Sequence, residues 1–131
     1  MRYLLDTNAA IAMLNDPHGR LARRARRENL ADVCVSAIII HELYYGAFCS
    51  ARATQNVALV DALRFVVLPF EKEDARWAGQ VRAQLRAKGT PIGSYDVLIA
   101  GQAVARNLTL ITHNRREFIR VEGLVTEDWE I

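Results

Sequence analysis

Short apolar runs alternate along the chain with longer segments of helical periodicity. Residues 3–5, 33–36, 66–68 and 108–112 have the length and the continuous apolar character of strands that are covered on both faces. A final edge strand is predicted at residues 124–125. Four or five strands of this kind are typical of a parallel sheet, because parallel strands are buried on both sides.

The segments between these runs predict helices. They cover residues 9–14, part of 18–29, 37–50, 54–64, a segment from about 71 to 88, and 95–106, with a short helical turn at 115–118. Ser36 and Ser94 are expected to cap helices, and Asp16 is expected to cap a helix that has Pro17 at its first position. Gly46 is expected to permit a close approach between helices. The alternation predicts one α/β domain over residues 1–131, with helices on both faces of a central parallel sheet of four to five strands.

The first predicted strand ends on an acid. Asp6 follows Leu5 directly, and Thr7 and Asn8 then turn the chain into an apolar helix. Ligands of open α/β sheets gather at the carboxyl ends of strands, so Asp6 is a candidate for binding a metal ion or a phosphate. Asp also commonly caps the helix that follows it, and this stretch alone does not separate the two interpretations.

Two further acids stand in apolar surroundings. Glu42 shares a helical stripe with Ile38, Tyr45 and Cys49, where a bare buried carboxylate would cost several kcal/mol. It therefore needs a neighbouring Arg, a metal ion or a position at a cleft. Asp96 lies in the first turn of a helix that is apolar almost all round, where the helix dipole favours its ionised form.

If Asp6, Glu42 and Asp96 converge, their mutual repulsion raises at least one pKa unless a cation is present. Mg²⁺ or Mn²⁺ takes oxygen ligands, binds substrate phosphates and lowers the pKa of a bound water. These acids therefore predict hydrolysis of phosphodiester bonds.

The net charge of the chain is only +2, but fifteen of its seventeen basic residues are Arg. Several of them fall in one predicted helix: Arg20, Arg23, Arg24, Arg26 and Arg27. Such a run is usually a solvated face, although it also makes a positive field that attracts phosphate. No apolar run is long enough to span a membrane, and no signal peptide is recognised, so a cytoplasmic protein is expected.

The ordered motifs resemble the PIN-domain ribonucleases. They are Asp6-Thr7-Asn8, Glu42-Leu43-Tyr44-Tyr45-Gly46, the segment 92–100 around Asp96, and Ile111-Thr112-His113-Asn114. The closing segments 115–124 and Glu127-Asp128-Trp129 resemble the VapC toxins of bacterial toxin–antitoxin pairs in particular. The resemblance covers essentially the whole chain.

The resemblance implies a Mg²⁺- or Mn²⁺-dependent endoribonuclease that inhibits translation in the bacterial cytoplasm. It further implies a PIN-like three-layer α/β/α fold, a homodimer, and a VapB-type antitoxin that enters the active-site cleft and binds operator DNA together with the toxin. The substrate implied by the closing segments is initiator tRNA, cut in the anticodon stem-loop.

For the site, the resemblance matches Asp6, Glu42 and Asp96 with the acids of the family. Asn114 stands where many members have a fourth Asp, so the number of metal ions stays open. Thr7 or Thr112 would hold a water or a carboxylate. The four arginines Arg20, Arg23, Arg24 and Arg27 would contact either RNA or the partner chain.

Three other classes of protein share some of these sequence features. A haloacid-dehalogenase phosphatase needs a second Asp at position 8, where this chain has Asn8. A receiver domain needs an earlier pair of acids and a Lys on a late strand, and this chain lacks both. The remaining alternative is a non-catalytic module with the same fold that binds RNA or protein and retains the acids for stability.

Overall fold

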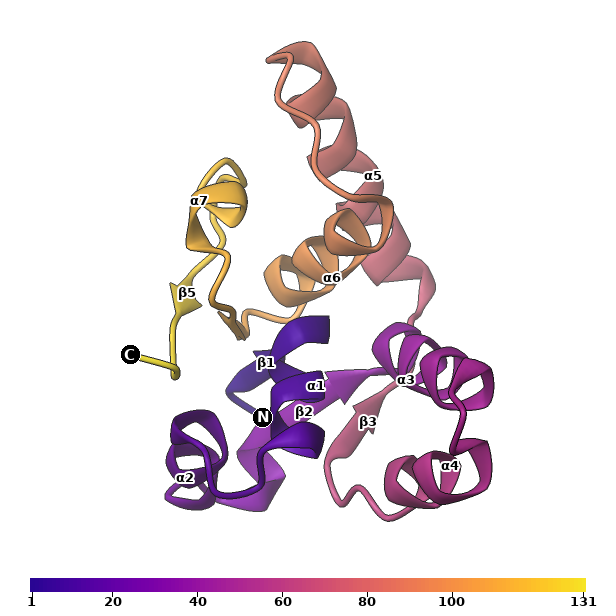
Figure 1. Cartoon of the computed structure of the whole chain (residues 1–131). Coiled ribbons are helices and arrows are strands. Elements are labelled where there is room, and N and C mark those ends of the chain that lie inside the picture. The colour runs from indigo at the N-terminus through magenta and orange to yellow at the C-terminus, as the bar shows by residue number, and fades with distance from the viewer.

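Five parallel strands form the centre of the structure, a computed structural model that describes residues 1–131 (Figure 1). The strands are β1 (Tyr3–Leu5), β2 (Val33–Ser36), β3 (Val66–Leu68), β4 (Thr109–Ile111) and β5 (Thr126–Glu127). Their order across the sheet is β3-β2-β1-β4-β5. Leu5 in the central strand pairs with Val35 on one side and with Ile111 on the other, and all three are buried.

Seven α-helices and one short 3₁₀-helix connect the strands. They are α1 (Thr7–Asn15), α2 (Arg20–Arg26), the 3₁₀-helix Leu30–Asp32, α3 (Ala37–Cys49), α4 (Ala53–Asp61), α5 (Lys72–Ala87), α6 (Ser94–Ala105) and α7 (Arg115–Phe118). None of these helices combines the length and the apolar character that a membrane crossing requires. The predicted α/β fold with a parallel sheet flanked by helices is confirmed.

The strand order explains where a site can form. Crossovers between parallel strands are right-handed, so α1 to α4 cover one face of the sheet and α5 to α7 cover the other. The chain therefore leaves the neighbouring strands β1 and β4 toward opposite faces. Such a reversal opens a crevice at the carboxyl ends of the two strands. Asp6 follows β1 and Thr112 follows β4 at this crevice.

Helices α5 and α6 pack against each other more closely than a side chain would allow at one point (Figure 1). A Cβ atom built on Gly101 would lie 2.4 Å from the Cα of Ala78. The close approach predicted at Gly46 is wrong, because nothing lies within 4 Å of a Cβ built there. Gly101 is the glycine on which a helix contact depends.

A buried ion pair joins the same two helices about one turn away from this contact. Asp74 of α5 is fully buried and accepts hydrogen bonds from Arg106 at 3.0 Å to its Oδ1 and at 2.9 Å to its Oδ2. It also accepts from the backbone N–H of Glu71, in a capping box that begins α5. Burial raises the pKa of Asp74, but these hydrogen bonds outweigh it and hold the pKa below its usual value. The position of α6 relative to α5 is thus set by both packing and charge.

Several local predictions differ from the structure. The last strand is Thr126–Glu127 and not residues 124–125, because Gly123 turns the chain with a φ of 78° and pairing with β4 begins after that turn. Ser94 is the first helical residue and not the cap, which is Gly93. Asp16 ends α1 instead of capping α2, whose cap is Gly19. Ser36 does cap its helix, since its hydroxyl accepts from the N–H of Ile38 at 3.2 Å.

We predict that Gly101→Ala destabilises the protein by about 1–3 kcal/mol, because the added methyl overlaps the backbone of Ala78 and forces α5 and α6 apart. The matched control is Gly79→Ala on the exposed side of α5, where nothing lies within 4 Å of the added methyl. Its better helix propensity should stabilise the protein by up to about 1 kcal/mol. Urea unfolding of both variants measures the difference, and equal effects of the two substitutions would contradict the packing argument.

Candidate active site

Asp6 is buried at the end of β1, with 5% of its surface exposed. Its Oδ1 accepts a hydrogen bond of 2.7 Å from the backbone N–H of Ala9, so it caps α1. Burial raises the pKa of Asp6 above its ordinary value, and hydrogen bonding by the Thr112 hydroxyl and by the N–H of Ala9 opposes this effect. Its second carboxylate oxygen is not used by the cap, so capping does not exclude a role as a ligand.

Asp96 stands in the first turn of α6 and is the most perturbed acid of the crevice. Its pKa is raised to about 6, first by burial and then by the negative charges of Glu117, Asp6 and Glu42. Charges act over such a site only when they are close, so four carboxylates from four parts of the chain share one region. Asp6 and Glu42, two of the predicted site residues, thus lie near enough to Asp96 for their charges to raise its pKa.

Glu42 reaches this region from α3. Its Oε1 accepts a hydrogen bond of 3.2 Å from the hydroxyl of Thr7. Thr7 follows Asp6 directly, so one turn of chain orients two of the carboxylates. Glu42 is partly exposed, and no Arg pairs with it. The alternative in which Glu42 is neutralised by a neighbouring Arg is therefore absent.

Glu117 is a fourth acid that the sequence analysis did not identify. It lies on the short helix α7, where its Oε2 accepts a hydrogen bond of 2.6 Å from Asn114 and its Oε1 accepts one of 3.3 Å from the N–H of Gly93. Gly93 in turn lies close to Asp96, because a Cβ built on Gly93 would lie 3.0 Å from Oδ2 of Asp96 and would push that carboxylate aside by a few tenths of an ångström. The signal in the sequence was the spacing of Asn114 and Glu117, which puts both on one side of a helical turn.

Asn114 therefore supports an acid in this structure. Its amide donates to Glu117, and its backbone N–H donates to the hydroxyl of Thr112 at 2.9 Å. Thr112 also lowers the pKa of Asp6 by hydrogen bonding. Thr7 and Thr112 thus each contact a carboxylate of the crevice, and Asn114 connects Thr112 with Glu117.

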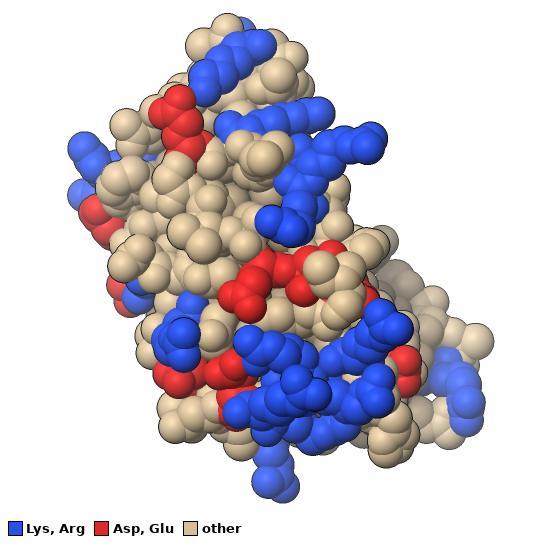
Figure 2. Space-filling model, turned by 90° about the vertical axis from the view of Figure 1, so that its left-hand side faces the viewer, with Lys and Arg blue, Asp and Glu red and all other residues tan.

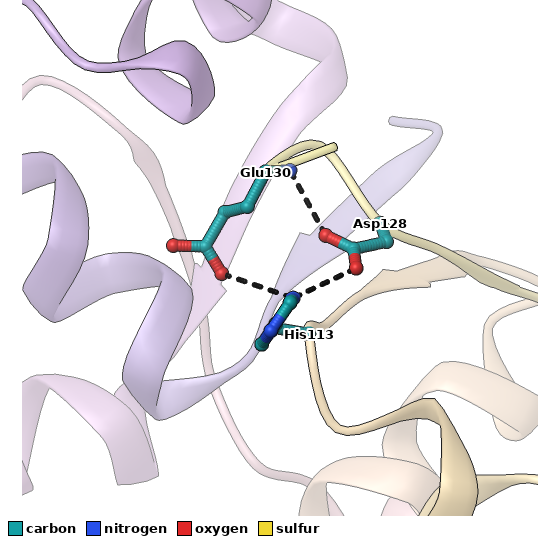
Figure 3. Close-up of side chains that lie close together, drawn as sticks. All are labelled: His113, Asp128 and Glu130. Atoms are coloured by element: carbon teal, nitrogen blue, oxygen red, sulfur yellow. Dashed lines mark hydrogen bonds and ion pairs between the residues drawn. The ribbon is translucent and has the colours of Figure 1, made fainter.

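The C-terminal tail adds a second cluster beside Asp6 (Figure 3). His113 Nδ1 lies 2.8 Å from Oδ2 of Asp128 and 3.8 Å from Oε2 of Glu130. The backbone N–H of Glu130 donates to Oδ1 of Asp128 at 2.9 Å, which orders the tail. Asp128 raises the pKa of His113, and the charges of Glu130 and Asp128 contribute to the raised pKa of Asp6. The tail packs against the body through the buried Trp129, and this packing brings its acids near Asp6.

The donor set of the crevice fits a divalent cation. Asp6, Glu42, Asp96 and Glu117 offer only carboxylate oxygens, which are the ligands that Mg²⁺ and Mn²⁺ prefer. The raised pKa of Asp96 shows that the carboxylates repel one another without such a charge. The possible ligand atoms that the structure already brings together, within 4.8 Å of one another, are those of His113, Asp128 and Glu130. The four carboxylates of the crevice do not form such a group, so their side chains would turn to hold one cation in common.

The predicted arginines lie apart from these acids, on α2. Arg20, Arg23, Arg24 and Arg27 line a pocket together with the C-terminal residues Glu127, Asp128, Trp129 and Ile131. Since Asp128 belongs both to this pocket and to the cluster with His113, the arginine surface borders the acidic crevice.

We predict that Asp96→Asn stabilises the cation-free protein by about 1–2 kcal/mol at pH 7.5, a range that allows for the partial exposure of Asp96. The pKa of Asp96 in the folded protein, about 6, lies above the ordinary value of 3.8, so its contribution to stability is present below pH 3.8 and lost as the pH rises through 6. The difference between variant and wild type should therefore be small at pH 4 and grow to a plateau above pH 7.

Urea unfolding over this pH range measures the effect, with Asp16→Asn as the control, because Asp16 is exposed and its side chain forms no hydrogen bond or ion pair. Addition of Mg²⁺ should stabilise the wild type more than Asp96→Asn, because binding to the folded state raises stability. A variant that is no more stable than the wild type at pH 7.5 would contradict the repulsion between these acids.

Comparison with known proteins agrees with this geometry. Residues 3–124 match the PIN domain family. The chain is 39% identical over 131 residues to the tRNA(fMet)-specific endonuclease VapC of Salmonella typhimurium, and 35% identical to ribonuclease VapC2 of Haemophilus influenzae, with 98% of each chain covered in both cases.

Solved structures show the same similarity. The VapC chain in DNA-bound VapBC from Salmonella typhimurium superposes with a TM-score of 0.94 at 39% identity, covering 98% of both chains. DNA-bound VapBC2 from Rickettsia felis gives a TM-score of 0.90 at 33% identity, covering 98% of this chain and 99% of that one. With its acids gathered where β1 and β4 diverge, the chain belongs to the PIN-domain ribonucleases of the VapC toxin family.

Proposed function

We propose that this chain is a divalent-metal-dependent endoribonuclease whose active site consists of Asp6, Glu42, Asp96 and Glu117. The observation that carries the proposal is the pKa of Asp96, which is raised to about 6 by burial and by the charges of the other three acids. A purely structural set of acids would be paired with cations of the protein, and these four are not paired with any Arg, Lys or His.

Each acid has a role that follows from its position. Asp6 is buried and Asp96 is half-buried, and burial is the first cause of the raised pKa of each, so these two would be the direct ligands of Mg²⁺ or Mn²⁺. A divalent cation held there would supply positive charge to phosphate oxygens and lower the pKa of a bound water. Glu42 is half-buried and is held by Thr7, so it is suited to accept the proton of that water.

Glu117 replaces the charge that Asn114 does not provide. It is oriented by Asn114 and by the N–H of Gly93, and its charge acts on Asp96. A fourth carboxylate at this position can complete the coordination of one cation or contribute to a second one. Asn114 then acts as a positioning residue through Glu117, and Thr112 does the same through Asp6.

The substrate we propose is initiator tRNA, cleaved in its anticodon stem-loop. Two relatives that match 98% of the chain, at 39% and 37% identity, carry the name tRNA(fMet)-specific endonuclease VapC. The same relationship supports a small antitoxin as the protein partner, because related chains occur as VapBC complexes on DNA.

A groove beside Glu42 suits the antitoxin. It has a volume of about 310 Å³ and lies between α1, α3 and α4. Its apolar lining includes Ile11 and Leu14 of α1, Leu43 of α3 and Leu59 of α4. An amphipathic segment bound there would cover apolar surface and reach the crevice next to Glu42. Binding of such a segment would block the site and explain inhibition of the toxin.

Replacing Asp6 by Asn or Asp96 by Asn should lower Mg²⁺-dependent RNA cleavage by about 100-fold or more, because each removes a charged ligand while keeping the shape of the side chain. Asn at position 6 also retains an oxygen for the cap of α1. The assay follows cleavage of initiator tRNA and maps the new 5′ ends, with Asp61→Asn as the control.

Wild-type protein that generates no new ends in any cellular RNA would favour the non-catalytic module. Full activity of both variants would show that the chemistry lies elsewhere. Cuts in an RNA other than initiator tRNA would leave the enzyme class intact and change only the substrate.

Glu117→Gln should weaken Mg²⁺ binding and lower the pKa of Asp96, since the negative charge of Glu117 is the largest charge effect on that pKa. The single amide oxygen of Gln can keep the hydrogen bond from Asn114, while the one from the N–H of Gly93 is lost because an NH2 group replaces the accepting oxygen. Isothermal titration with Mg²⁺ and NMR titration of Asp96 measure the two effects. Unchanged Mg²⁺ affinity together with an unchanged pKa of Asp96 would remove Glu117 from the site.

A further inference from the structure

The arginines of α2 differ from one another in ways that the sequence does not reveal. Arg24 forms ion pairs with Glu28 and, at 3.5 Å, with Glu127. Its guanidinium carbon also lies 4.8 Å from the centroid of the Trp129 ring. Trp129 is buried, with 4% of its surface exposed. Arg24 therefore attaches the C-terminal tail to α2, and its positive charge is balanced by Glu28 and Glu127.

Arg20, Arg23 and Arg27 are free by comparison. All three are exposed, and none of them forms an ion pair or a side-chain hydrogen bond within the chain. Their spacing of three and four residues puts them on one face of α2, which continues in helical conformation through position 27. At 1.5 Å per residue they span about 10 Å along the helix. Three unpaired guanidinium groups thus form a straight positive row.

This row borders a pocket of about 310 Å³ between α2 and the C-terminal tail. Four arginines line the pocket together with only two acids, Glu127 and Asp128, and Glu127 is paired with Arg24. The charge that the pocket presents to a ligand is therefore positive. Such a pocket fits an anion, and a planar guanidinium binds phosphate oxygens through two parallel hydrogen bonds.

The pocket also adjoins the catalytic carboxylates. Asp128 lines it, and the charge of the same Asp128 contributes to the raised pKa of Asp6. Figure 2 shows that Lys and Arg gather over the lower part of this face, where α2 lies in Figure 1, and that Asp and Glu lie next to them toward the middle. A strand that passes through the acidic crevice would therefore meet the arginine row directly beside it.

We propose that Arg20, Arg23 and Arg27 bind consecutive phosphates of the RNA strand next to the bond that is cleaved. This inference rests on the proposed ribonuclease function and specifies how the substrate is held. The acidic crevice repels RNA, so attraction over a distance has to come from cations at its border. Three consecutive phosphates, about 3.4 Å apart along a helix axis, span about 7 Å, so a row of about 10 Å is long enough to contact all three.

The test compares Arg20→Gln/Arg23→Gln/Arg27→Gln with a matched control, Arg52→Gln/Arg64→Gln/Arg76→Gln, which removes the same charge from exposed positions far from the pocket. The probe is a synthetic anticodon stem-loop of initiator tRNA. Its binding is measured by fluorescence anisotropy without divalent cations, and its cleavage is measured with Mg²⁺, at salt concentrations between about 50 and 200 mM.

In the α2 variant we expect the slope of log affinity against log salt to decrease by about 2 to 3, because each lost phosphate contact contributes about 0.7 to 0.9. KM should rise by about 10-fold or more, and the loss should fall on KM more than on kcat. The control variant should lower the slope by less than about 1. Arg24 is left in place in both variants, so the tail remains attached.

An α2 variant whose salt slope and KM equal those of the control would overturn the inference. So would a loss of affinity for the antitoxin with unchanged RNA binding, because the row would then recognise an acidic protein segment. If the wild type cleaves no RNA, the ribonuclease proposal fails, while the anisotropy measurement still decides whether the row binds RNA.

Discussion

Repulsion between carboxylates in a partly buried crevice is the interaction on which the rest of this structure depends. Asp96 keeps a proton up to about pH 6 because it is buried and because three other acids lie near it. Without compensation such a group of charges would open the crevice. Neutral donors hold the acids instead: Thr7 for Glu42, the N–H of Ala9 for Asp6, and Asn114 for Glu117. These donors orient the carboxylates without neutralising them, so the negative charge remains available for a cation.

The strands and helices that keep the carboxylates in place against their mutual repulsion make their own contacts outside the crevice. Asp6 and Thr112 are held by neighbouring strands, since Leu5 pairs with Ile111 at the carboxyl ends of β1 and β4. Asp96 depends on α6, which is locked to α5 where Gly101 meets Ala78. The pairing of β1 with β4 and the packing of α5 on α6 thus oppose the repulsion between the carboxylates, because rearranging such buried contacts would cost several kcal/mol.

The parts of the site that the sequence predicts are those that break a local pattern. Asp6 ends an apolar strand, Glu42 interrupts an apolar stripe, and Asp96 begins an apolar helix. A carboxylate in such surroundings needs a cation or a hydrogen-bond donor, so each of the three could be recognised in the sequence. Glu117 broke no pattern, because acids are common in short exposed helical turns, and its role depends on contacts with Gly93 and Asn114 that are distant or ambiguous in sequence. The last strand was misplaced for a related reason: its position is decided by pairing with β4, while its residues Thr126 and Glu127 are polar.

The arginines of α2 also differ from one another in a way that the sequence does not predict. Their sequence is a uniform basic run, yet Arg24 is paired and packed on Trp129 while its neighbours on the same face are unpaired. The difference arises from the tail, which returns more than 100 residues later to place Glu127 and Trp129 against one position of the helix. Because the tail also carries Asp128, the segment that neutralises one arginine is the segment that adds negative charge beside Asp6. The net charge of +2 therefore conceals a boundary between an acidic crevice and a basic helix, and the proposed binding of an RNA strand depends on this contrast.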